Sequence, residues 1–148
     1  MATTTYLDII RLNEAKTYLK VDDQTITDNE IVGMINSALS YIEKSTGWVM
    51  FARDKNYFGT YYVDVFDFPI NTVVVDTIEK GSYSRVPTVD GKVTLNVGIA
   101  EREELPQELI NCALELISFW YYNEETKNAQ NSIPDFVQAN IDKNRRFI

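Results

Sequence analysis

The spacing of apolar residues changes twice along this chain, and these changes limit the folds that it can adopt. From Ile31 to Ile42 the apolar residues recur three or four positions apart, as on one face of a helix. Between residues 48 and 98 they tend to alternate with polar residues, which is typical of strands. After Pro106 the helical spacing returns. We therefore predict an α+β fold: a helical core, with a long central helix and a late aromatic helix, into which a small antiparallel β-sheet is inserted.

Capping residues predict where the helices begin and end. The central helix should begin at Thr27 or Asp28, both good N-cap residues, and Gly47 should end it in a left-handed conformation. Pro106 and Pro134 each suit the first turn of a later helix. We expect one domain over residues 1–148, with helices over about 12–46 and 106–142, a β segment over about 48–98 and a flexible tail over 143–148.

The β segment predicts several short strands and two turns, one of them at Gly81-Ser82. Aromatic and β-branched residues mark strands over 48–51, 57–68 and 72–78, and Asp90-Gly91 is a strong hairpin signal before the alternating residues 93–97. Along 57–68 both faces carry large apolar side chains. This strand could thus be covered on both sides, with a neighbouring subunit as one of the covers.

The charge of the chain argues against nucleic-acid binding as its main activity. The chain has 14 basic and 22 acidic residues, a net charge of −8. Contact with a DNA backbone normally needs clustered Lys and Arg, whereas the basic residues here are scattered, and the same argument disfavours anionic membranes. An acidic surface would still suit a passage through which DNA slides. With a single cysteine, no secretory signal and no long apolar run, we expect a soluble protein made in a cytoplasm.

The residues that usually carry catalysis are missing or unremarkable. The chain has no histidine, no glycine-rich phosphate loop and no calcium-loop spacing, so we expect no enzyme, cofactor or metal site. Cys112 lies within an apolar helix and is expected to be an inert, packed thiol. Asp64 and Asp67 lie among aromatic residues, a combination seen in sugar-binding and glycosidase sites, but a regular strand would point them to opposite faces.

The order of these short motifs resembles the phage head–tail connector (adaptor, or head completion) family. The opening 12–19 followed by acidic 22–23, and the helix end 40–47 with its Thr-Gly stop, are similar to the first two elements of that family. The proline-marked segment 68–73 resembles its entry into a Val-rich strand. The late helix 105–124, with its aromatic residues before a polar cluster, looks like the family's late helix, although Glu124 stands where Arg is expected. Ile133-Pro134 and the closing Arg145-Arg146 resemble its tail.

This resemblance implies a structural protein of the virion, at the junction between portal and tail. Such subunits form a ring, here expected to have about twelve copies, through head-to-tail contacts that close on rotation. One face would bind the portal protein and the other the next tail or connector protein, and DNA would pass through without specific binding. No catalysis is implied, and synthesis would take place in the cytoplasm of the bacterial host.

Two regions are predicted to make the contacts. One is the aromatic strand, and the other is the C-terminal segment, which combines cations with apolar groups and is either a frayed end or a docking peptide that becomes ordered on a partner. The candidate interface residues are Tyr57, Phe58, Tyr61, Tyr62, Phe66, Arg145, Arg146 and Phe147. Two other functions remain open: a tail-completion or terminator ring protein, and a carbohydrate-binding module that uses the aromatic strand.

Overall fold

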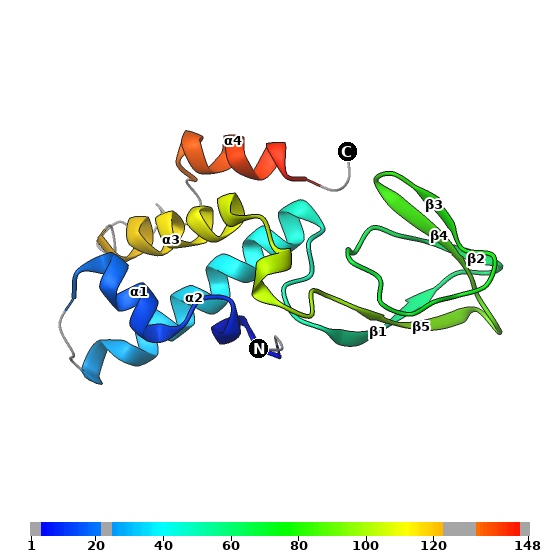
Figure 1. Cartoon of the computed structure of the whole chain (residues 1–148), viewed down its shortest axis with the longest axis horizontal. Helices are drawn as coiled ribbons and strands as arrows, with labels where there is room; N and C mark the ends of the chain where they lie inside the picture. The colour runs from blue at the N-terminus through cyan, green and yellow to red at the C-terminus, as the bar shows by residue number, and fades with distance from the viewer. Residues whose placement is uncertain (1–3, 22–24, 123–132, 146–148) are drawn as a thin grey trace.

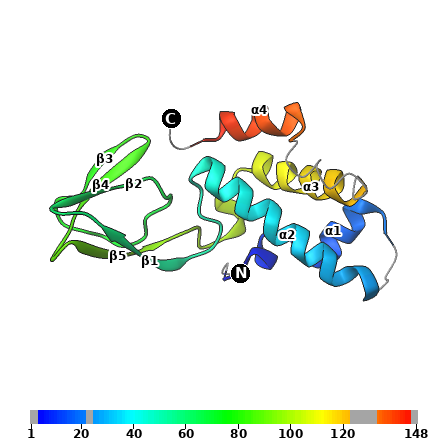
Figure 2. The same ribbon diagram turned by 180° about the vertical axis from the view of Figure 1, so that it is seen from behind.

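The fold consists of a helical part at one end and a β part at the other. The computed structural model describes residues 4–21, 25–122 and 133–145. Figures 1 and 2 show the helices gathered at one end of the elongated molecule and all strands at the other. The predicted α+β class is confirmed. In chain order the elements are η1 (Tyr6–Asp8), α1 (Leu12–Leu19), α2 (Thr25–Thr46), β1 (Arg53–Phe58), β2 (Tyr62–Val65), β3 (Ile78–Lys80), β4 (Tyr83–Pro87), β5 (Lys92–Val97), η2 (Arg102–Glu104), α3 (Gln107–Tyr122) and α4 (Asp135–Lys143).

The helical core forms where the apolar stripe of α2 packs against α3, with α1 and α4 on either side (Figure 1). Ile31, Ile35 and Ile42 of α2 are completely buried, as the helical spacing predicts. Gly47 ends α2 at φ +84°, and its N–H donates to the Glu43 carbonyl at 3.0 Å. The late aromatic residues Trp120 and Tyr121 pack against this core.

The start of α2 differs from the prediction. The helix begins at Thr25, two or three residues before the expected caps. Asp28 therefore lies in the first turn, where a carboxylate interacts favourably with the positive helix end. It also pairs with Lys16 of α1 at 2.8 Å, which ties the two helices together.

The β part contains two small antiparallel sheets instead of the one expected. β1 pairs with β5, and the second sheet has the order β2-β4-β3. A second apolar core contains buried residues from both sheets and from the segment that leads into the β part; these residues are Val49, Val65, Val86, Leu95 and Val97. The Asp90-Gly91 turn before β5 is confirmed, since both residues adopt positive φ, 53° and 80°.

The predicted continuous strand over 57–68 is wrong. It is two strands that belong to different sheets, with a turn at Gly59–Tyr61 between them. A Cβ atom on Gly59 would lie 2.2 Å from the Tyr62 carbonyl oxygen, so the chain turns sharply where only glycine fits.

The strands predicted over 48–51 and 72–78 are also largely absent. Only Trp48 forms a bridge in the first segment, and only Ile78 of the second belongs to a strand. Val73 and Val75 are 97% and 81% exposed in the loop that precedes β3. β-branched side chains favour strands only where a neighbouring strand pairs with them. Among the described residues no strand pairs with this loop, and of its valines only Val74 packs against the second core.

Three backbone hydrogen bonds join the two parts where the chain enters and leaves the β part. The Val49 N–H donates to the Phe68 carbonyl at 2.7 Å, and the Phe68 N–H donates to the Gly47 carbonyl at 2.8 Å. The Ile99 N–H donates to the Val49 carbonyl at 3.0 Å. The entry and exit segments are therefore held side by side at the end of α2.

One carboxylate on α2 extends this junction. Glu43, near the end of the helix, accepts hydrogen bonds from the Met50 N–H at 2.9 Å and from the Tyr6 hydroxyl at 3.2 Å. It also forms an ion pair with Arg53, the first residue of β1. Arg53 in turn lies over the Phe51 ring, 4.3 Å from its centroid. This cluster links η1, α2 and β1.

Candidate functional site

Three of the predicted aromatic contact residues lie at the end of the β part farthest from the helices. There the turn between β1 and β2 lies beside the turn between β4 and β5 (Figure 1). The Gly59 N–H donates to the Gly91 carbonyl at 3.1 Å, and the Thr88 N–H donates to the Tyr61 carbonyl at 2.9 Å. We call this region the distal tip, defined by its exposed residues Phe58, Tyr61, Tyr62 and Val89.

The distal tip exposes several large apolar side chains. Phe58 and Tyr61 are 70% and 77% exposed, and Val89, which the sequence analysis did not single out, is 77% exposed. Large exposed aromatic residues that cluster in one place are typical of contact surfaces between proteins. This arrangement favours the predicted role of Phe58, Tyr61 and Tyr62.

Tyr57 and Phe66 do not belong to the distal tip. Tyr57 faces the second core, and its hydroxyl donates to Asp67 Oδ2 at 2.5 Å. Burial, with the neighbouring Asp67 carboxylate, raises the pKa of the Tyr57 hydroxyl well above its usual range. Phe66 packs against Tyr83 of β4, with 5.5 Å between the ring centroids.

The two carboxylates considered for sugar chemistry are both held in ion pairs. Asp64 accepts from Arg85 at 2.9 and 3.4 Å on the outer side of the β2–β4 ladder, and these hydrogen bonds lower the pKa of Asp64. Asp67 pairs with Lys55 at 2.8 Å, in addition to its contact with Tyr57. The arrangement is that of structural ion pairs, and these two residues do not form a facing carboxylate pair around an open site.

The C-terminal contact region is only partly described. Arg145 follows α4, donates from Nε to the Ser45 carbonyl at 3.0 Å and pairs with Asp142 at 3.0 Å. Before it, the Asn144 side chain donates to Glu108 at 2.8 Å. Arg146 and Phe147 lie outside the described residues.

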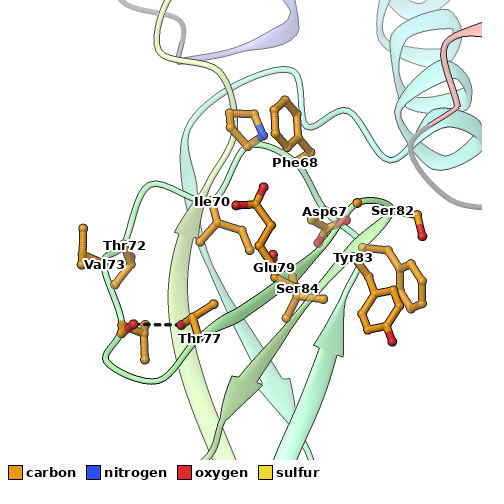
Figure 3. Close-up of a pocket in the computed structure, with 15 residues that line it drawn as sticks. Asp67, Phe68, Ile70, Thr72, Val73, Thr77, Glu79, Ser82, Tyr83 and Ser84 are labelled. Atoms are coloured by element: carbon orange, nitrogen blue, oxygen red, sulfur yellow. Dashed lines mark hydrogen bonds between the residues drawn. The ribbon is translucent and has the colours of Figure 1, made fainter.

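A pocket that the sequence did not reveal lies between the β3–β4 hairpin and the loop that follows β2 (Figure 3). Its volume is about 320 Å³, at the lower end of the usual range for ligand sites. Phe68 and Ile70 contribute apolar walls, and Asp67 and Glu79 contribute carboxylates. No sequence motif pointed to this pocket, because its walls come from segments that the fold alone brings together.

The other predictions concern metal, membrane and thiol chemistry. Among residues 4–21, 25–122 and 133–145 there is no cluster of three or more metal-ligating side chains. Within the same ranges, no helix is long and apolar enough to cross a membrane. Cys112 is completely buried, and burial raises the pKa of its thiol to about 11, in agreement with an inert, packed side chain.

Comparison with known proteins identifies the fold. No protein-family model matches the sequence, and no curated protein matches it. A chain of the virion of a native gene transfer agent (GTA) particle superposes with a TM-score of 0.71 at 15% identity, over 99% of this chain and 93% of that one. A chain of the neck of an empty GTA particle, computed with C6 symmetry, superposes with a TM-score of 0.70 at 15% identity, over 100% of this chain and 95% of that one. This protein therefore shares its whole fold with chains that are part of a virion and its neck.

Proposed function

We propose that this protein is a structural subunit of a virion neck: a ring adaptor between the portal and the tail, which extends the DNA channel and catalyses no reaction. The observation that carries the proposal is the agreement in fold with a neck chain over 100% of this chain and 95% of the other. A fold shared over nearly the full length of both chains favours a similar position in a particle.

The distal tip supports a role in assembly. Rings form from head-to-tail contacts, in which one patch of a subunit meets a different patch of its neighbour. The distal tip is one such patch, and the C-terminal region around Arg145, at the other end of the β part, is a second. The neck with a similar chain was computed with sixfold symmetry, with which a ring of about twelve copies is compatible.

The net charge of −8 also fits the proposed channel. A ring of acidic subunits would repel the phosphate backbone, so DNA could slide through without being held.

The proposal is tested first with the purified protein and the portal protein of the same particle. Negative-stain electron microscopy and mass measurement, with and without the portal, should reveal closed rings with a central opening. Phe58→Ser should reduce ring formation or portal binding at least tenfold. Phe136→Ser, which removes a similarly exposed aromatic residue from α4, is the matched control and should have little effect.

Other outcomes would point to the alternative functions. Rings that bind tail-tube protein but not portal protein would indicate a tail-completion or terminator ring. Binding to a glycan panel that is lost on Tyr61→Ala, without any ring or portal complex, would indicate a carbohydrate-binding module. Absence of the protein from purified particles, measured by peptide mass spectrometry, would refute a virion role altogether.

A further inference from the structure

Two apolar surfaces lie at opposite ends of the sheet β2-β4-β3. One is the distal tip, where Tyr62 of β2 pairs with Pro87 of β4. The other is the pocket beside the β3–β4 hairpin, whose wall includes Val65 and Ser84, the pair at the other end of the same two strands. Figures 1 and 2 agree that the β3–β4 turn is directed toward the helices and the distal tip away from them. The tip of a molecule therefore cannot fill its own pocket.

The pocket can hold an aromatic side chain. Its volume of about 320 Å³ is in the range of sites for small organic molecules, which are larger than a single aromatic ring. Figure 3 shows Phe68 and Ile70 on its walls and Val73 on the loop that borders it. Val73 and Phe66, which also line the pocket, are exposed. The apolar wall thus continues onto the surface around the pocket.

Charge favours a contact between the tip and the pocket to a smaller extent. Lys92 is paired with Phe58 in the β1–β5 ladder, so both side chains lie on the same face of that sheet. Asp90, in the turn before β5, lies outside this ladder. The charged residues that line the pocket are Asp67 and Glu79, both acidic. Because exposed ion pairs contribute little to affinity, the charges would orient the contact and the apolar side chains would hold it.

We propose that the distal tip of one molecule docks in this pocket of a neighbouring copy. The contact rests on the proposed ring function and specifies its subunit contact, since a ring closes when one patch of each subunit meets a different patch of the next. Phe68 of the pocket wall packs on Trp48, which donates to the Asn144 carbonyl, so the pocket adjoins the C-terminal region described above. A tip-to-tip pair would instead leave the pocket uncovered.

The contact should be weak between two isolated molecules. A completely buried aromatic side chain removes about 150–250 Å² from water, and the tip offers only a few such side chains. Stable complexes bury about 1,200–2,000 Å² in total. In a closed ring every subunit makes two of these contacts, which raises the overall affinity without any new kind of contact. The isolated contact is therefore measured at high protein concentration.

A mixture of two variants tests this contact without portal protein and without a ring. The tip variant, Phe58→Ser with Tyr61→Ser, keeps its pocket, and the pocket variant, Val73→Asp, keeps its tip. All three substitutions replace exposed side chains, so both chains should fold. Neither variant should associate by itself, whereas the mixture should form a one-to-one dimer. In the ¹⁵N-labelled tip variant, the amide NMR signals of Thr72 and Ser84 in the pocket wall should shift and saturate as unlabelled pocket variant is added.

Two further substitutions in the labelled tip variant separate the pocket from its surroundings. Adding Val73→Asp to the tip variant should weaken the binding by about tenfold or more. Val75→Asp is the matched control, because Val75 is an exposed valine of the same loop that is not among the residues lining the pocket. It should change the affinity by no more than about twofold.

Two results would overturn the proposal: pocket signals that do not change at millimolar concentrations of the pocket variant, and equal binding with and without Val73→Asp in the tip variant. In either case the proposed function would stand if the unmodified chain still formed rings on the portal. Conversely, saturable binding in the pocket by a protein that is absent from purified particles would support the contact and refute the virion role.

Discussion

The Glu43 cluster provides a stringent test of how the two parts of the molecule are held together. In Glu43→Ala the buried Met50 N–H loses a charged acceptor, which costs about 1.5–3 kcal/mol, and Arg53 loses its ion pair. Because the Arg53 side chain is 25% exposed, loss of the ion pair adds only about 1 kcal/mol to the destabilisation. We expect the free energy of unfolding to fall by about 3 kcal/mol, which corresponds to a decrease in Tm of about 6–12 °C for a chain of this size.

Urea unfolding followed by circular dichroism and by tryptophan fluorescence measures this loss. Glu43→Gln keeps an acceptor for Met50 but removes the charge, so it should cost only about 1 kcal/mol. Glu103→Ala, which removes an exposed acid, should stay within about 0.5 kcal/mol of the unmodified protein. If Glu43→Ala were no more destabilising than Glu103→Ala, the junction would not depend on this carboxylate and the reasoning would be refuted.

Three further predictions follow from single residues. Gly98→Ala should destabilise the protein by about 3 kcal/mol or more in urea unfolding, because φ of Gly98 is +118° and the new methyl group would lie 2.1 Å from a backbone oxygen. Gly33→Ala, at an exposed position within α2, should instead stabilise the protein by about 0.5–1 kcal/mol. Equal effects of the two substitutions would contradict this reasoning. Hydrogen bonds from Arg102 lower the pKa of Glu14, so its stabilising contribution is present above the unfolded pKa of about 4.3 and is lost as the pH falls through the folded pKa. The urea midpoints of the unmodified protein and Glu14→Gln should therefore differ at pH 7 and converge near pH 3, and a constant difference would argue against this linkage. Because burial raises the pKa of the Cys112 thiol to about 11, thiol reagents at pH 8 should modify it only after unfolding, and rapid modification of the folded protein would contradict the packed position.

The helices could be predicted from the sequence because their signals are local. The apolar stripe of α2 and the stop at Gly47 lie within one continuous segment, and so do Pro134 and the helix that follows it. The start of α2 was misplaced, since Asp is as acceptable in a first turn as at a cap, and Pro134 is the N-cap residue of α4 and not part of its first turn.

The strands could be predicted only in part because their signals are not local. Residues 57–68 have strong strand propensity throughout, yet their division at Gly59 depends on two different partners, β5 and β4. β4 itself, the central strand of its sheet, has the sequence Tyr-Ser-Arg-Val-Pro, which shows no clear alternation. Its pairing with β2 and β3 determines its conformation, and no short window of sequence contains that information.

The same reason limited the prediction of the site. Tyr57 and Phe58 are neighbours of similar chemistry, but the pairing of Tyr57 with Val93 turns Tyr57 toward the core and Phe58 toward solvent. The pocket around Glu79 brings together residues from a loop and a hairpin. Neither the orientation of these two side chains nor the pocket follows from strand propensity. The aromatic composition therefore indicated a contact surface, but it did not show which aromatic residues are exposed and which are buried.

The hydrogen bond between Val49 and Ile99 has a consequence for how this protein can vary. The chain leaves the helical part near Val49 and returns to it near Ile99, and the Ile99 N lies 3.0 Å from the Val49 carbonyl oxygen. The β part between these two residues is therefore an insertion into a helical scaffold. A tight turn of a few residues could join Met50 to Ile99, and both of these residues would keep their places in the helical core. Proteins that share this fold could therefore exchange, shorten or enlarge the whole β part, and with it the distal tip, while the helices α1 to α4 keep their packing.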